Sequence, residues 1–256
     1  MKIAENTFKA AIEAGRQQVG LWSSLSSGLA ADILSTAGFD WVLVDMEHSP
    51  NDLFSVMHQL QVYAASGTHA VVRPPWNEPV MVKRLLDLGA FSLLFPMVQN
   101  AEEAAAAVAA CRYPPRGIRG VSLNHRGNRY GAARDDYLER GEASIAVLVQ
   151  IESRAAMNEL EDIAGTDGVT GVFFGPADLS ADFGHMGNPA HPEVVAAIRE
   201  GTATLRGLGK PSGILVPDAE AGRFWLQEGM AFVAAGTDQA LLAGSARSLR
   251  AALPET

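Results

Sequence analysis

The sequence has little cysteine, no long hydrophobic run and an excess of acidic over basic residues, and each feature excludes a class of protein. Its one cysteine, Cys111, cannot form an internal disulfide or a cysteine-rich zinc site. The densest apolar run, residues 91–98, is too short to span a bilayer, and residues 1–15 lack the apolar core of a secretory signal. A net charge of −9 disfavours binding to nucleic acid. We therefore expect a soluble, cytoplasmic protein whose partners are neither nucleic acids nor membranes.

Several residues and motifs typical of other enzyme classes are also missing. The chain has only four lysines, and none lies at the C-terminal end of a strand-like run: Lys2, Lys9, Lys83 and Lys210. Schiff-base chemistry needs a desolvated lysine inside the site, so that mechanism is disfavoured. The serine-nucleophile motif G-x-S-x-G and the dinucleotide-binding motif G-x-G-x-x-G are both absent. We expect no organic cofactor.

Short apolar runs alternate with longer segments of helical periodicity along the whole chain. Most of the runs are continuously apolar, which is typical of parallel strands covered on both faces. They begin at Val19, Trp41, Ala70, Phe91, Ile145, Gly171, Ser212 and Phe232. Eight strand–helix units in about 250 residues predict a single α/β domain, residues 1–256, folded as a (β/α)8 TIM barrel. The rival fold, a doubly wound open sheet, usually carries the dinucleotide loop that this chain lacks.

Two carboxylates lie where catalytic groups gather in such a barrel, at the C-terminal ends of strands. Glu152 ends the fifth run and Asp178 follows the sixth. Hard oxygen donors without nearby thiols or paired histidines suit Mg²⁺ or Mn²⁺ and suit zinc poorly. Either carboxylate could instead cap a helix or pair with an arginine. An unpaired carboxylate after an apolar strand is costly, which favours a function for Glu152.

A histidine and an arginine end two other strands. His48 follows Asp45 by three residues, and a carboxylate bonded to its imidazole would suit a general base; the alternative is a histidine that caps a helix. Arg73, between an apolar run and two prolines, could stabilise an oxyanion or form a structural ion pair. The remaining histidines are interpreted as surface or loop residues: His58, His69, His125, His185 and His191.

One connection, residues 112–142, shows no clean periodicity and carries seven arginines. Loops of this length are usually functional or mobile. It is either a solvated surface loop with ion pairs or an electropositive rim that attracts anionic substrates.

The motifs of the chain resemble those of a known family, the HpcH/HpaI aldolases, over about residues 5–253. The matching segments are WVLVDMEHSP, VVRPP, LLDLGA, PMVQNAEEA, YPPRGIRG, QIES and GVFFGPADLS. The resemblance implies a class II pyruvate aldolase that needs a divalent metal (Mg²⁺ or Mn²⁺, or Co²⁺). It also implies a barrel whose last helix is exchanged between subunits, in a homohexamer built from dimers.

The resemblance assigns roles to individual residues. It implies Glu152 and Asp178 as metal ligands, His48 as base, and Arg73 as the group that stabilises the enolate. The residues implied to orient or tune the base are Asp45 and Asp87. Those implied to bind the substrate carboxylate are Gln150 and the backbone of Ala177. The expected wall of the pocket comprises Trp22, Leu215 and Val216, and the alternative is that these three residues belong to the ordinary core of the barrel.

The chain departs from the commoner family pattern at residues 123–128, LNHRGN, in a loop that the family places on the acceptor side of the site. These bulkier polar residues favour a polar or anionic aldehyde. The predicted reaction is reversible cleavage of a 4-hydroxy-2-oxo acid to pyruvate, or hydroxypyruvate, and an aldehyde. Two alternatives are a related lyase that acts on a CoA thioester of the citramalyl or malyl type, and a barrel that binds ketoacids without catalysis.

Overall fold

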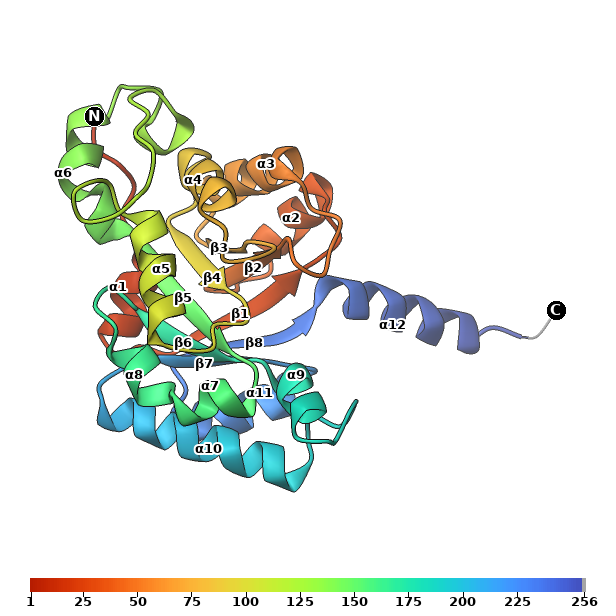
Figure 1. The fold of residues 1–256 in the computed structure, drawn as a ribbon. Helices are drawn as coiled ribbons and strands as arrows, with labels where there is room; N and C mark the ends of the chain where they lie inside the picture. Colours follow the sequence, from red (N-terminus) through yellow and green to blue (C-terminus); the bar gives the residue numbers. More distant parts are fainter. Residues whose placement is uncertain (255–256) are drawn as a thin grey trace.

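The structure, a computed structural model, describes residues 1–254 as a closed barrel of eight parallel strands in sequence order (Figure 1). This confirms the predicted TIM barrel. The strands are β1 (Gln18–Ser23), β2 (Trp41–Asp45), β3 (His69–Arg73), β4 (Ser92–Phe95), β5 (Ala146–Ile151), β6 (Gly171–Phe174), β7 (Ser212–Val216) and β8 (Phe232–Thr237). Each contains or adjoins one of the eight apolar runs.

Most of the helices surround the barrel (Figure 1), and α1 lies at its N-terminal end. They are α1 (Thr7–Glu13), α2 (Gly28–Ser35), α3 (Leu53–Tyr63), α4 (Pro79–Asp87), α5 (Ala101–Cys111), η1 (Arg126–Asn128, a 3-10 turn), α6 (Arg134–Ser144), α7 (Arg154–Asn158), α8 (Leu160–Gly165), α9 (Pro176–Asp182), α10 (Pro192–Gly207), α11 (Ala219–Gln227) and α12 (Asp238–Ala251). Among residues 1–254, no helix combines the length and the apolar character needed to cross a membrane.

The apolar strands supply two cores, one on each face of the closed sheet. The inner core fills the barrel and includes Trp22, Leu94 and Phe173, with Phe8 and Ile12 of α1 packed into its N-terminal end. The outer core lies between the strands and the helices, where the buried Cys111 packs. Because both faces are covered, alternate residues of one strand belong to different cores.

The direction of the elements determines which residues can meet at the barrel mouth, the end where the strands finish. Each helix runs back toward the start of the next strand, so loops after strands lie at the mouth and loops after helices lie at the opposite end. Across β2 and β3, Asp45 is paired in register with Arg73 at the last position of both strands. The register alone therefore brings these two residues side by side at the mouth.

Within the long connection at 112–142, the structure contains a helix that the sequence pattern does not predict. Helix α6 buries only Tyr137 and Gly141. It therefore has no apolar stripe, and its sequence shows no helical periodicity of hydrophobic residues. The connection starts after α5 and ends before β5, which places it at the end opposite the mouth (Figure 1).

The last helix, α12, extends away from the barrel rather than covering it (Figure 1). Only Asp238, at its start, is buried. Its exposed apolar side chains are Leu241, Leu242 and Leu249.

Candidate active site

An arginine and a carboxylate form a bidentate pair at the mouth. Arg73, with 6% of its surface exposed, donates from Nε to Oδ1 of Asp45 and from Nη2 to Oδ2, both at 2.8 Å. The indole Nε1 of Trp22 donates to the same Oδ2 at 3.2 Å, and the guanidinium lies 4.8 Å from the centre of the Trp22 ring. Fork-to-fork hydrogen bonds and the aromatic ring together determine the orientation of the guanidinium.

The third guanidinium nitrogen faces two other polar groups. Nη1 of Arg73 lies 2.7 Å from Oε2 of Glu47 and donates to Oε1 of Gln150 at 3.4 Å. Glu47 has no role predicted from the sequence, although it lies between Asp45 and His48. The signal that could have identified it is its place in the same strand-end segment.

Glu152 belongs to the same group, and both of its carboxylate oxygens accept hydrogen bonds. Its side chain is almost fully buried, with Oε2 accepting from the backbone N–H of Met97 and Oε1 accepting from Nε2 of Gln150, at 2.8 and 2.7 Å. Met97 has a positive φ of 54°, which is uncommon for a residue other than glycine and is often found at functional sites. This backbone conformation directs its N–H to the carboxylate.

The electrostatics of these groups show an excess of negative charge. Burial raises the pKa of Glu152 to about 7, and the nearby charges of Glu47 and Asp178 add to that effect. Burial also raises the pKa of Glu47, against the attraction of Arg73. Burial acts in the same direction on Asp45, but the hydrogen bonds and charge of Arg73 outweigh it and hold the pKa of Asp45 below its ordinary value.

Three carboxylates, which we call the carboxylate cluster, therefore lie close enough at the mouth for their charges to interact: Glu47, Glu152 and Asp178. Arg73 attracts both Glu47 and Glu152, and its Nε and Nη2 are already bound to Asp45. A divalent cation would offset this repulsion, and the donors are carboxylate oxygens, which Mg²⁺ and Mn²⁺ prefer. The residues present thus fit such an ion.

Asp178 and Ala177 reach the mouth from the first turn of α9. Both are exposed, and the N-cap Gly175 offers no capping side chain. The first N–H groups of a helix have no partner within it and favour anions.

His48 lies at the mouth, but the predicted bond between its imidazole and Asp45 is wrong. The side chain of His48 is 70% exposed, and its Nε2 is 3.9 Å from Oε2 of Glu47. Asp45 binds Arg73 instead, because a guanidinium offers two charged donors where an imidazole offers one. The helix-capping alternative also fails, since the N-cap of α3 is Asp52.

Asp87 does not join this group within one chain. It is the last residue of α4, next to the start of β4, and therefore lies at the opposite end of the barrel. Its Oδ1 accepts a 2.7 Å hydrogen bond from Nη2 of the buried Arg119. Asp87 could therefore lie near a barrel mouth only if that mouth belonged to a second copy of the chain.

Of the three predicted wall residues, one faces elsewhere. Trp22 belongs to the inner core, and Leu215 packs against it. Val216 belongs to the outer core, because neighbouring residues of a strand point to opposite faces. The prediction that its side chain lines the pocket is wrong.

The arginine-rich connection is not a rim of this mouth. Arg126 and Tyr130 line a hollow of about 680 Å³ together with His69 and Phe91, which lie near the starts of β3 and β4. Most of its arginines have partners: Arg112, Arg116, Arg119 and Arg140 pair with carboxylates, and Arg126 donates to backbone carbonyls. These pairs favour the interpretation as a surface connection with ion pairs.

Two histidines interpreted as surface or loop residues are also largely enclosed. His125 is buried against Tyr137, with 4.9 Å between the ring centres. His69 stacks on Phe8 and lies 2.8 Å from the hydroxyl of Ser92. Both lie away from the mouth.

Known proteins resemble the chain over nearly its whole length. A family model described as HpcH/HpaI aldolase/citrate lyase matches residues 18–244. A 4-hydroxy-2-oxo-heptane-1,7-dioate aldolase of Escherichia coli is 52% identical over 248 residues, covering 96% of this chain and 94% of that protein. A pyruvate aldolase of Rhizobium etli is 51% identical over 251 residues, 98% of each protein. The crystal structure of an HpcH/HpaI aldolase/citrate lyase family protein from Burkholderia cenocepacia has a TM-score of 0.93 at 39% identity, covering 96% of this chain and 98% of that one.

Proposed function

The chain belongs to the HpcH/HpaI aldolase/citrate lyase family, and we propose that it cleaves a 4-hydroxy-2-oxo acid into pyruvate and an aldehyde in a reversible, metal-dependent reaction. Hydroxypyruvate is a further candidate donor. The observation that carries the proposal is the carboxylate cluster beside an arginine oriented by two hydrogen bonds to Asp45.

The proposed metal ligands are Glu152 and Asp178. Their oxygen donors favour Mg²⁺ or Mn²⁺, with Co²⁺ compatible. When bound, such an ion supplies Lewis-acid chemistry to a 2-oxo acid.

We assign Arg73 to the oxygen that gains negative charge as the pyruvate enolate forms. Its Nε and Nη2 are bound to Asp45, so Nη1 is the nitrogen directed toward Glu47 and Gln150. A donor already held in position needs no reorganisation when charge develops, which is the basis of oxyanion stabilisation. Asp45 and Trp22 act as positioning residues for Arg73.

The carboxylate of the substrate is assigned to Gln150 and the backbone N–H of Ala177. Gln150 contacts both Arg73 and Glu152, so a carboxylate bound there would lie beside both proposed functional groups. The start of α9 adds N–H donors that favour an anion.

His48 is the proposed base. In cleavage it takes the proton of the C4 hydroxyl, the C4 oxygen becomes the aldehyde carbonyl, and the C3–C4 bond breaks. The electron pair of that bond forms the enolate of pyruvate, and a proton added at C3 completes the pyruvate methyl group. In the reverse direction the same base removes a methyl proton. The exposed ring suits exchange of its proton with solvent.

Trp22 and Leu215 are the proposed wall against the aldehyde. A polar or anionic aldehyde recognised by residues 123–128 would require a second subunit, because this segment and Asp87 lie at the opposite end of the barrel. We propose an oligomer, a dimer-based hexamer with α12 exchanged, since the exposed leucines of α12 are an apolar surface that a partner could cover. A cytoplasmic location remains a prediction.

The test is to supply 4-hydroxy-2-oxoheptanedioate with Mg²⁺ and follow pyruvate release with lactate dehydrogenase. We expect pyruvate at a rate that EDTA abolishes and added Mg²⁺ restores. Cleavage of malyl-CoA or citramalyl-CoA without cleavage of any free 4-hydroxy-2-oxo acid would overturn the proposal. So would tight binding of pyruvate with no turnover in either direction.

A further inference from the structure

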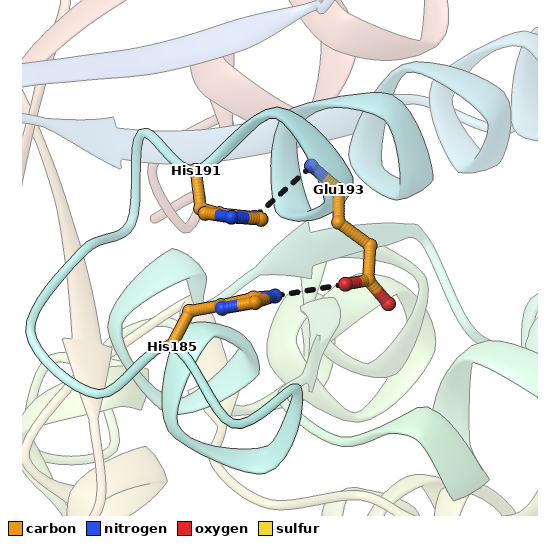
Figure 2. A group of neighbouring side chains, drawn as sticks. All are labelled: His185, His191 and Glu193. Atoms are coloured by element: carbon orange, nitrogen blue, oxygen red, sulfur yellow. Dashed lines mark hydrogen bonds and ion pairs between the residues drawn. The ribbon is translucent and has the colours of Figure 1, made fainter.

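A second group of potential metal ligands lies outside the proposed catalytic group. It consists of His185, His191 and Glu193, which we call the histidine cluster (Figure 2). One ligand atom from each of the three lies within 4.8 Å of the others. The group sits between the end of α9 and the first turn of α10, on the mouth side of the barrel.

The two imidazoles are stacked face to face. Their centres are 3.4 Å apart and their planes differ by 18° (Figure 2). Neutral imidazole is the form that binds metals.

The loop that presents these side chains is already ordered. Gly184, with φ of +81°, turns the chain before His185. Backbone hydrogen bonds then connect His185 to Ser180, Asn188 to His185 and His191 to Asn188, at 2.7–3.0 Å. The backbone of the loop would therefore need little further ordering on binding an ion, and the change falls on the side chains.

Both carboxylate oxygens of Glu193 have polar partners, and this arrangement suits a metal ligand. Oε2 lies 2.8 Å from Nε2 of His185, and Oε1 accepts from Nη2 of Arg154 at 2.6 Å. An ion on the Oε2 side would leave Arg154 in place on Oε1, as an outer partner that orients the ligating carboxylate.

We propose that the histidine cluster is a second cation site, specific for a borderline-soft transition metal of the Zn²⁺ class. Two imidazole nitrogens and one carboxylate oxygen form a ligand set that zinc accepts, whereas Mg²⁺ prefers oxygen alone. Each side chain is partly or fully exposed, which leaves water as the remaining ligand. The site is independent of the proposed aldolase reaction.

Binding would replace two existing hydrogen bonds and would tilt the two rings out of their stack, so that both nitrogen lone pairs face the ion. The ion takes the place of the bond between His185 and Glu193, and coordination by His191 replaces the 3.3 Å bond that its Nδ1 accepts from the backbone N–H of Glu193. That second bond is long, so its loss costs little. In exchange the ion joins the loop after α9 to the start of α10, and Zn²⁺ should raise the melting temperature.

The experiment is equilibrium dialysis against Zn²⁺ alone, with bound zinc per chain measured for the unaltered protein and three variants. His185→Ala and His191→Ala should each bind one Zn²⁺ fewer, or bind it at least about tenfold more weakly, since even outer-shell changes cost 10–100-fold. His58→Ala, an exposed histidine on α3, is the matched control and should bind as the unaltered protein does. His185→Ala should keep Mg²⁺-dependent turnover, which verifies its fold.

Unchanged zinc stoichiometry and affinity in both cluster variants would overturn the proposal. A second measurement does not depend on any variant folding. Cu²⁺ bound to the unaltered protein should give an electron paramagnetic resonance spectrum with coupling to at least two imidazole nitrogens. A spectrum with coupling to fewer than two nitrogens would also overturn the proposal, whatever the outcome of the dialysis.

Discussion

Gly175 leaves no room for a side chain above the carboxylate of Glu152. A β-carbon at Gly175 would lie 2.5 Å from Oε1 and 2.7 Å from Cγ of Glu152. Glu152 cannot easily move aside, because Met97 and Gln150 hold its two oxygens. The absence of one methyl group at the end of β6 therefore allows a buried carboxylate to occupy the mouth.

Gly175→Ala should displace that carboxylate and lower kcat/KM by about 10²-fold, the cost of a misplacement near 1 Å. The measurement is pyruvate release at saturating Mg²⁺, together with the melting temperature. Gly165→Ala is the control, since its β-carbon would meet nothing within 4 Å. Activity of Gly175→Ala within threefold of the unaltered protein would contradict a functional role for the position of Glu152.

Arg73→Ala should raise the barrier by about 2.7–4 kcal/mol, the value for one oxyanion donor. Arg73→Lys should also be slow, because lysine cannot make the bidentate pair with Asp45. Both are measured as initial rates of pyruvate release, with Arg199→Ala, a surface arginine paired with Glu228, as control. A loss under threefold for Arg73→Ala would contradict the assigned role.

Stability should fall in mild acid because of His69. Burial lowers the pKa of His69 to about 4, against about 6.5 in the unfolded chain. Between these values the unfolded chain binds a proton that the folded chain does not. The full contribution of neutral His69 to the free energy of unfolding is therefore present above pH 6.5. Up to about 3 kcal/mol of that free energy is lost as the pH falls to 4.

Urea unfolding at pH 7, 5.5 and 4.5 measures this loss. His69→Gln removes the titrating group, and its unfolding free energy should depend less on pH over this range. If the variant and the unaltered protein lose the same free energy between pH 7 and 4.5, His69 is not the source.

Asp87→Asn should destabilise the chain by about 1–3 kcal/mol, because the buried guanidinium of Arg119 would lose its charged partner. Chemical denaturation measures the change. Asp135→Asn, an exposed acid in the first turn of α6, is the control and should lie within about 0.5 kcal/mol of the unaltered protein. Equal stability of the two variants would show that the Asp87–Arg119 pair is not important for the fold.

The fold is highly predictable from the sequence, and the site is partly so. Continuous apolar runs identify all eight strands because both faces of a parallel barrel sheet are buried. Strand ends then identify Asp45, Arg73, Gln150 and Glu152, because parallel strands finish at one mouth. Helix α6 cannot be predicted in this way, because it buries only two residues and has no periodic apolar stripe.

The remaining errors concern side-chain partners, which no linear pattern specifies. Asp45 could bind either His48 or Arg73, and the parallel register that pairs it with Arg73 decides between them. Val216 and Leu215 are adjacent, but only the strand's orientation reveals which one faces inward. Gly175 and Glu152 follow two different strands, and their close approach cannot be predicted from the sequence of either segment alone.

The most direct test of the central claim is exchange of the pyruvate methyl protons in D₂O, followed by proton NMR without any aldehyde. We predict exchange that requires Mg²⁺, stops on addition of EDTA, and is lost in Glu152→Gln and in His48→Ala. Exchange that continues in EDTA, or no exchange with any divalent metal, would contradict metal-dependent enolate chemistry at this mouth.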